Sequence, residues 1–266
     1  MLGNPFGVLL LALAILFCSC KKTELDTNIT DPDIPKGLIK SKTVVEGNNL
    51  KDIFEYNSDK KLAKIARYLG GQPYEWIAFE YHKTTIISII YDNFPLSETG
   101  RDTLFMNEKG LVYLINKYIK TPTGYQYAES QRYDYDKDNY LIKYSSEKKY
   151  PSGPCQTFRN ITVSSQNTTY AELIFECAPE ANFQISNLFY SENYNTLDNE
   201  YQGQPYLGKT NIKPIQRSTW MKGLKFLSED SYQYKFNTAG LIVEMICTNR
   251  NENYVTGSIT TIYEYY

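Results

Sequence analysis

The chain has 266 residues, which is enough for one large all-β domain or two small ones with a sizeable hydrophobic core. Twenty-five tyrosines raise the aromatic content to 15%, a composition typical of half-buried pleated sheets. The charge is nearly balanced, with 28 basic and 30 acidic residues and no stripe of Lys or Arg, and this argues against nucleic acid as a partner.

The N-terminus predicts export and a lipid anchor. The apolar run FGVLLLALAILF (6–17) has the length of a signal-peptide core and is too short to cross a bilayer as a helix. Cleavage before Cys20 would leave the small Ser19 at the last removed position, whereas cleavage before Cys18 would leave the bulky Phe17 there. The segment therefore resembles a bacterial lipoprotein signal peptide, with Cys20 as the lipidated residue. MLGNPFG carries no Lys or Arg, which departs from the lipoprotein pattern. An ordinary secretory signal without lipid is the alternative.

Three segments follow from this interpretation. Residues 1–19 are the signal peptide, residues 20–37 are the lipidated N-terminus with a flexible tether, and residues 38–266 form a single all-β domain. The tether is polar and contains prolines without an apolar period. A lipidated cysteine carries at least two acyl chains, and two chains suffice for stable attachment to a membrane. We therefore expect the protein at the bacterial outer membrane, facing either the periplasm or the cell surface.

Four segments share one hairpin pattern: FEYNSDKKLAKI from Phe54, LFMNEKGLVYLI from Leu104, YDYDKDNYLIKY from Tyr133 and YKFNTAGLIVEM from Tyr234. Each has apolar or aromatic residues at its first and third positions, then Asn or Asp, and three residues later Gly, Asn or, in the first copy, Lys60. Asn and Asp start a turn by binding their own backbone, and Gly or Asn accepts the positive φ that closes it. The pattern predicts four β-hairpins.

The acidic series Asp134, Asp136 and Asp138 in the third copy resembles the opening of a calcium loop. Such a loop also requires Gly at the position of Asn139 and Glu at the position of Ser145. Asp136 and Asp138 fall at turn positions that the other copies fill with Asn and with Asp, Lys or Ala. We therefore interpret this series as a hairpin tip and expect no metal site.

The remaining elements complete an all-β prediction of about a dozen antiparallel strands, arranged as a meander that curls into a barrel-like or porin-like sheet. The segments 74–82 and 85–92 are apolar on both faces, so both faces should be covered. Residues 178–230 are rich in Asn, Gly and Pro and have no period. Because so long a structureless loop is uncommon, we expect it to pack across the sheet or plug the barrel, covering the second face of 74–92.

The cysteines predict one disulfide. With Cys20 lipidated, Cys155, Cys177 and Cys247 remain for pairing in the domain. Cys155 and Cys177 are equidistant from Gln166 in the polar turn SSQNT, so a hairpin centred there places them opposite each other. An exported protein meets oxidising conditions. We expect a Cys155–Cys177 disulfide and a free, buried Cys247; two reduced core cysteines are the alternative.

Few residues suggest chemistry. His82 is the only histidine and lies at a predicted turn, so a catalytic triad or a histidine metal site has little to build on. Trp76 falls in a doubly apolar strand and is expected in the core, whereas Trp220 is the candidate for stacking on a sugar ring. Thr103, in the sequence DTL, resembles an acceptor for O-glycosylation in Bacteroidetes secreted proteins. We expect no catalytic residue, no metal and no cofactor.

Two resemblances bear on the class of protein. The hairpin pattern looks like the tyrosine–aspartate repeats of Rhs-type shells, but its copies start 50, 29 and 101 residues apart, which is not a regular array. The CSCKK start, the hairpins and PYLGKTNIKPI (205–215) before YQYKFNTAGLI together resemble a family of Bacteroidetes lipoproteins of unknown function with a porin-like β fold. This resemblance covers roughly residues 38–266 and implies an architecture and a compartment but no activity.

These features favour a membrane-anchored, non-enzymatic domain that binds an unknown protein or a glycan. One alternative is a glycan-active enzyme that uses a pair of carboxylates, since 30 acidic residues supply many pairs. The other is an integral outer-membrane barrel, suggested by the aromatic C-terminus IYEYY. Lys and Glu among the strand residues and the lipid anchor argue against the integral barrel.

Overall fold

The computed structural model describes residues 37–47, 49–93, 96–150, 153–197, 199–209, 211–252 and 254–266. Contacts divide the chain into two units, Met1–Asp33 and Ile34–Tyr266, and all of the described residues belong to the second unit. Cys20, the predicted signal peptide and nearly all of the predicted tether therefore lie outside the described residues. Within the described ranges, no helix is long and apolar enough to cross a membrane.

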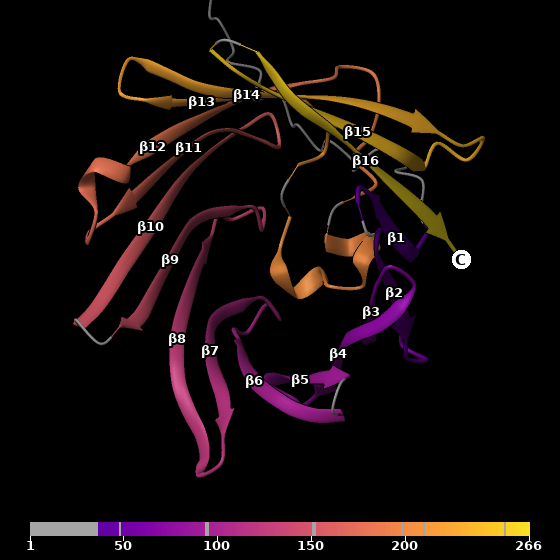
Figure 1. Cartoon of the computed structure of the whole chain (residues 1–266), viewed down its shortest axis with the longest axis vertical. Helices are drawn as coiled ribbons and strands as arrows, with labels where there is room; N and C mark the ends of the chain where they lie inside the picture. The colour runs from indigo at the N-terminus through magenta and orange to yellow at the C-terminus, as the bar shows by residue number, and fades with distance from the viewer. Residues whose placement is uncertain are drawn as a thin grey trace, which may run out of the picture. The chain divides into compact units, whose positions relative to one another are not determined.

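The second unit is a closed barrel of antiparallel strands that follow one another round the ring in chain order, closed by pairing of the last strand with the first (Figure 1). The strands are β1 (Ile39–Val45), β2 (Leu50–Tyr56), β3 (Leu62–Leu69), β4 (Gln72–Tyr81), β5 (Thr85–Asn93), β6 (Leu96–Met106), β7 (Val112–Thr121), β8 (Gly124–Tyr135), β9 (Leu141–Tyr150), β10 (Gly153–Ser164), β11 (Asn167–Phe175), β12 (Phe183–Phe189), β13 (Ile215–Lys222), β14 (Lys225–Phe236), β15 (Ile242–Asn251) and β16 (Val255–Tyr265). The predicted antiparallel meander is confirmed.

The barrel has 16 strands rather than about a dozen. Residues 178–230, predicted as irregular, in fact contain β12, β13 and the start of β14. These strands mix polar and apolar residues on both faces, which hides the period of two that marks a half-buried strand. Three short 3-10 helices complete the structure: η1 (Pro179–Ala181), η2 (Asn199–Gln202) and η3 (Pro205–Leu207).

The four predicted hairpin tips share one geometry. In each, the side-chain oxygen of an Asn or Asp accepts two backbone N–H groups, two and four residues further on, and the third residue after it has positive φ. The turn residues are Asn57 with Lys60 (φ 60°), Asn107 with Gly110 (77°), Asp136 with Asn139 (70°) and Asn237 with Gly240 (76°). Asp136 thus makes the same two bonds as the Asn residues. The interpretation of the acidic series as a hairpin tip is confirmed.

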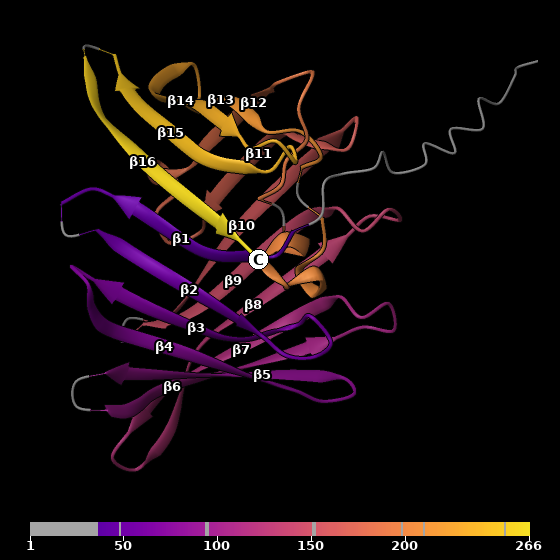
Figure 2. The same cartoon turned by 90° about the vertical axis from the view of Figure 1, so that its right-hand side faces the viewer.

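The described part of the connection between β12 and β13, residues 190–197, 199–209 and 211–214, lies inside the ring (Figure 1), and we call it the plug. Figure 1 shows its helices η2 and η3 within the barrel, and Figure 2 shows them at one end. The plug bonds to turns from around the ring: the Leu62 N–H donates to Gly203 O, the Leu141 N–H to Lys209 O, the Ile212 N–H to Gln166 O and the Ile242 N–H to Thr196 Oγ1. The expectation that residues 178–230 pack across the sheet or plug the barrel is confirmed for this connection, whereas much of the rest of that segment forms strands of the barrel wall (Figure 1).

The plug completes the hydrophobic core at its end of the barrel. Tyr206 on η3 is 6% exposed and packs with four buried residues of β5, β6 and β7: Ile86, Leu104, Val112 and Ile115. A second cluster gathers buried residues of β1, β2, β3, β15 and β16, with Leu197 of the plug packed against it. Because strand side chains alternate between two faces, these contacts define the inward face of every strand they involve.

The plug covers only the inward face of β4 and β5, where Tyr81 meets Tyr206 edge-on at 6.2 Å. The outward face carries Trp76, stacked on Tyr91 with their ring centroids 3.9 Å apart and with the Lys64 ammonium over the indole. The expectation of a core position for Trp76 is therefore wrong. Cross-strand stacking shields the indole instead, because aromatic pairs bury area without a second layer.

The cysteine-bearing hairpin has the predicted register, with Thr157 opposite Phe175 and Ile161 opposite Ala171. The turn differs in detail: its two-residue loop and a bulge near Val163 together keep the register that a three-residue loop would give. Cys155 and Cys177 are joined by a disulfide, with their Cα atoms 5.7 Å apart. Cys247 is free and half-buried opposite Tyr232.

Candidate functional site

The inward wall divides into two halves. Next to the plug, inward residues such as Ile86 and Val112 are 1% and 0% exposed. Toward the other end, Ile119 on β7 and Ile259 on β16 are 57% and 39% exposed, although strand pairing places both on the inward face. We call this second part of the inward wall the open half. Its polar and aromatic side chains include Lys42, Asp52, Arg67, Glu75, Asp102, Lys117, Glu129, Lys148, Arg159, Trp220, Asp230 and Asn249.

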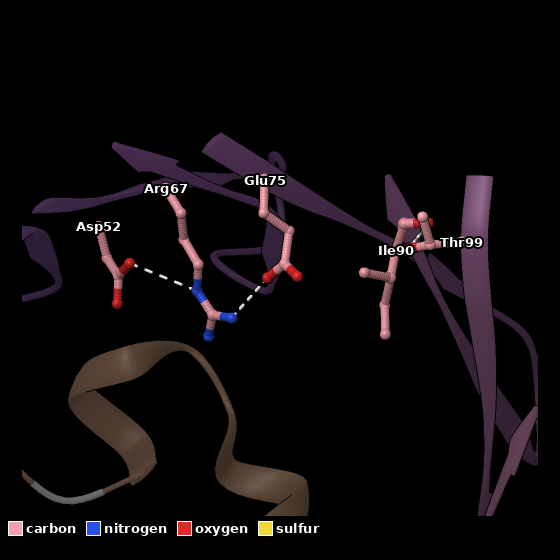
Figure 3. A network of polar contacts seen from close by, with 5 residues as sticks. All are labelled: Asp52, Arg67, Glu75, Ile90 and Thr99. Atoms are coloured by element: carbon pink, nitrogen blue, oxygen red, sulfur yellow. Dashed lines mark hydrogen bonds and ion pairs between the residues drawn. The ribbon is translucent and has the colours of Figure 1, made fainter. Parts of the chain in front are cut away.

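Three of these residues form an ion-pair network across β2, β3 and β4. Arg67 Nη1 lies 2.5 Å from Glu75 Oε1, and Arg67 Nε lies 3.4 Å from Asp52 Oδ1 (Figure 3). Burial raises the pKa of Asp52, and the positive charge of Arg67 opposes this rise. The guanidinium is thus held between two carboxylates of the protein itself.

A second charged group lies on β6, β7 and β8. Lys117 stands between Asp102 and Glu129 in the strand register. Burial raises the pKa of Asp102, Lys117 lowers it, and the nearby Glu129 raises it further. Ser88 on β5 hydrogen-bonds to the Asp102 carboxylate. Here too the inward cation faces carboxylates of the protein itself.

Trp220 lies on the inward face of β13, in a group that combines aromatic and polar surfaces. Its Nε1 donates to Asp230 Oδ2 at 3.0 Å, and the Asn249 side-chain amide donates to Asp230 Oδ1 at 2.6 Å. The Phe183 ring lies 5.1 Å from the indole, centroid to centroid, and Phe175 continues the row at 6.0 Å from Phe183. An indole with a carboxylate and an amide held beside it can stack on an apolar ring face and hydrogen-bond to hydroxyl groups.

Sequence reasoning identified only Trp220 in this group, and it placed this residue in an irregular segment rather than in a strand. Phe183, Asp230 and Asn249 belong to three other strands, β12, β14 and β15. The signal that could have found them is a polar residue at an inward position of an otherwise apolar alternation. This pattern can be recognised only once the register of all four strands is known.

The other predicted residues lie away from this group. Thr103 is on the outward face of β6, between Ile87 and Asn116. His82 is exposed at the turn between β4 and β5. The Cys155–Cys177 disulfide joins the ends of the hairpin at the open half. Among the described residues, no three His, Cys, Asp or Glu side chains are grouped as a metal site.

The outer face carries ion pairs on strands around the ring. They are Lys51–Glu264 (4.0 Å), Lys64–Glu55 (3.4 Å), Arg101–Glu98 (3.4 Å), Arg217–Glu229 (3.5 Å) and Lys235–Glu244 (2.7 Å). The strand register places these charged side chains on the outward face, whereas neighbouring residues such as Phe54 and Tyr234 lie on the inward face. Charged side chains thus interrupt the apolar residues of the outer face.

The fold and the inward wall define a closed antiparallel barrel with an internal plug. A porin-like protein from Bacteroides uniformis ATCC 8492 has a similar structure, with a TM-score of 0.61 and 14% identity over 87% of this chain and 100% of that chain. A porin-like protein from Bacteroides vulgatus ATCC 8482 has a TM-score of 0.56 and 12% identity, covering 87% and 99%. At these identities the likeness shows the barrel fold. No model of a known protein family and no curated protein matches the chain.

Proposed function

We propose that the protein is a non-enzymatic binding barrel of the bacterial outer membrane, anchored by lipid on Cys20, whose open half takes a glycan. The observation that carries this proposal is the group of Trp220, Phe183, Asp230 and Asn249 on a solvent-accessible inward wall. Ligand sites are concave and combine aromatic surface with a few placed polar groups, and this wall has both kinds of surface.

The plug supports a binding role rather than passage through the barrel. Its backbone bonds to turns of several hairpins, and its Tyr206 is buried in the core of the wall. A barrel filled at one end and lined with polar groups at the other is suited to hold a molecule that enters from the open half. We therefore do not propose that molecules pass through this barrel, although its structural neighbours are described as porin-like.

Anchoring by lipid, rather than by insertion of the barrel, fits the outer face. A lipid-facing barrel wall needs an apolar band about 25 Å tall, and Arg or Lys at the bilayer midplane costs about 2–4 kcal/mol. Five ion pairs on the outer face speak against such a band. The location at the outer membrane rests on the sequence CSCKK and on the fold.

A glycan-active enzyme is the second candidate, and the inward acids are the observation that favours it. Burial raises the pKa of Asp102, as a general acid requires. We rank this candidate lower because the structure places a cation between Asp102 and Glu129, and another between Asp52 and Glu75. These cations hold the pairs as structural networks.

Fluorescence of the two tryptophans tests the proposal. Trp220 lies on the inward face and Trp76 on the outward face, so W76F leaves only the inward reporter and W220F only the outward one. A glycan selected on an array should change the emission of W76F and leave that of W220F unchanged. Replacing Trp220 with Ala should weaken binding about tenfold, the value of a lost aromatic stack, whereas W76A should not.

Two results would contradict the proposal. Binding that W220A leaves intact would place the ligand elsewhere, and an array on which no glycan binds would remove the ligand class. Cleavage of the bound glycan that is abolished by D102N or by E129Q would instead show that the protein is a glycan-active enzyme. Metabolic labelling with a palmitate analogue tests the anchor, because the label should be lost from a C20A variant.

A further inference from the structure

Among the described residues, Arg159 is an inward cation without a hydrogen-bond or ion-pair partner. It lies on β10, where the register sets it opposite Tyr144 of β9 and Leu173 of β11 on the inward wall. Its Nε is buried and has no hydrogen-bond partner. Among the described residues, no carboxylate forms an ion pair with it. The side chain as a whole is half-buried, so part of the guanidinium faces the interior of the barrel.

This arrangement differs from that of two other inward cations, Arg67 and Lys117. Arg67 lies between Asp52 and Glu75, and Lys117 lies between Asp102 and Glu129. A buried charge without a partner is expensive, because its lost hydration is not replaced. Burial lowers the pKa of Arg159, and no neighbouring carboxylate opposes that shift. An anion that binds to Arg159 would offset the desolvation cost of this charge, so the free site favours anion binding.

Toward β9, the inward side chains next to Arg159 are neutral hydrogen-bonding groups, whereas toward β11 they are the apolar Leu173 and Phe175. On β9, Tyr144 lies opposite Arg159, and the next inward pair along β9 and β10 is Ser146 with Thr157. Gln131 of β8 faces Ser146, but its side-chain amide donates to Glu129 Oε1 at 2.7 Å, so it is not counted among the free donors. Hydroxyl donors beside a guanidinium form a receptor for a planar or tetrahedral anion, since the guanidinium supplies paired N–H groups and the hydroxyl groups supply further donors.

We propose that Arg159 is an anion subsite of the open half, and that the glycan bound there carries an acidic group. This inference rests on the proposed function and adds the charge of the ligand. Arg159 on β10 and Trp220 on β13 are three strands apart, about 14 Å along the wall at roughly 4.8 Å per strand. A ligand that reaches both residues is an oligosaccharide with its acid group at one end and a stacked ring at the other.

The test compares anionic and neutral oligosaccharides by isothermal titration calorimetry. The probes are an oligogalacturonate, which carries carboxylates, a heparin-derived oligosaccharide, which carries sulfates, and a neutral maltooligosaccharide of the same length. R159Q should weaken binding of the preferred anionic probe about 10-fold to 100-fold, the value of a charge-assisted hydrogen-bond pair, without changing the affinity for the neutral probe. R159K should restore part of the loss, because it keeps the charge without the planar fork.

Arg217 provides the matched control, since it is an arginine on the outward face of β13 paired with Glu229. R217Q should bind all three probes as the wild type does. Melting temperature gives a second readout. An R159L variant should melt at a higher temperature than the wild type without ligand, because it removes an unpaired buried charge, and the anionic probe should no longer raise its melting temperature.

The outcomes separate the two proposals. Loss of binding in W220A with full anionic affinity in R159Q would overturn the anion subsite and leave the glycan site standing. Equal affinity of the wild type for anionic and neutral probes would also overturn it. A lower melting temperature in R159L would assign Arg159 a structural role. Preference for the carboxylate or the sulfate probe, lost in R159Q, would support the subsite and name its anion.

Discussion

Single residues set the local geometry of this barrel, and the four hairpin tips show how far local chemistry reaches. Asn or Asp at the start of each turn binds two backbone N–H groups further along, whatever the rest of the chain does. The sequence therefore predicts these turns correctly. Even Lys60, which lacks the freedom of glycine, adopts φ 60° in the place that Gly110 and Gly240 fill elsewhere.

Asp102 gives a prediction about pH. Burial raises its pKa above the ordinary value of 3.8, so the folded protein holds this proton at a pH where the unfolded chain has released it. The contribution of Asp102 to stability is therefore greatest at acidic pH and falls as the pH rises through the pKa of the folded state. D102N should remove this fall, and its stability relative to the wild type should increase between pH 4 and pH 7.

Urea unfolding at pH 4, 5, 6 and 7, followed by tryptophan fluorescence, measures the effect. D138N is the control, because Asp138 is an exposed turn residue. Its stability should run parallel to that of the wild type over the same range. A constant difference between D102N and the wild type at all four values would contradict the assignment of Asp102 as a buried acid.

Among the elements, the plug is the least predictable part of the fold. Its residues lack a period because each is placed by a different strand: Thr196 by Ile242, Gly203 by Leu62 and Lys209 by Leu141. The composition indicates that the segment must be packed somewhere, since a long exposed loop of this kind is uncommon. Its path through the barrel follows from the closed ring, which no local pattern encodes.

Two glycines test the fit of the plug. Gly208 has φ 73°, and a Cβ there would lie 2.4 Å from the Tyr135 ring and 2.8 Å from the carbonyl oxygen of Asn139. Gly223 has φ 58° in the turn after β13 and would meet nothing within 4 Å. Alanine at either position costs roughly 1–2 kcal/mol for the left-handed backbone. G208A should cost about 1–3 kcal/mol more, the value of overpacking a filled core.

Thermal and urea unfolding of the two variants separates these terms. Equal losses for G208A and G223A would mean that the plug moves away from Tyr135 without cost. A loss in G208A together with unchanged circular dichroism in the far ultraviolet would show that the strands persist while the plug is displaced.

A recurring tyrosine contact links the elements into the ring. In five strand pairs, a tyrosine near the end of an even-numbered strand donates its hydroxyl to the carbonyl oxygen of the first residue of the preceding strand. The pairs are Tyr56 with Ile39, Tyr81 with Leu62, Tyr135 with Val112, Tyr234 with Ile215 and Tyr265 with Ile242, at 2.7–2.9 Å. Three of these tyrosines, Tyr56, Tyr135 and Tyr234, belong to the hairpin copies. The high tyrosine content predicts a half-buried sheet, but the repeated hydrogen bond can be recognised only once the strand register is known.

At the scale of the whole molecule, the sequence predicts the class of fold but not the assembly of the candidate site. Period-two strands and short turns leave an antiparallel meander as the simplest arrangement. The group around Trp220, however, joins four strands whose register carries bulges, such as the one between Trp220 and Met221. A single bulge moves the following residues to the other face, so the contact of Trp220 with Asp230 cannot be read from spacing.

The charged pairs on the outer face of the ring predict that residues 38–266 form a soluble monomer without detergent. Lys64 with Glu55 and Lys235 with Glu244 place charged pairs on the outward face of strands on both sides of the β1–β16 closure. In lipid each buried Lys would cost about 2–4 kcal/mol at the midplane, whereas in water these pairs keep the barrel hydrated. Light scattering after size-exclusion chromatography should therefore give the mass of one chain in plain buffer. Aggregation in buffer with a monomer in detergent would instead indicate a barrel that inserts into the membrane, and the outward charges would then have to lie outside its lipid-facing band.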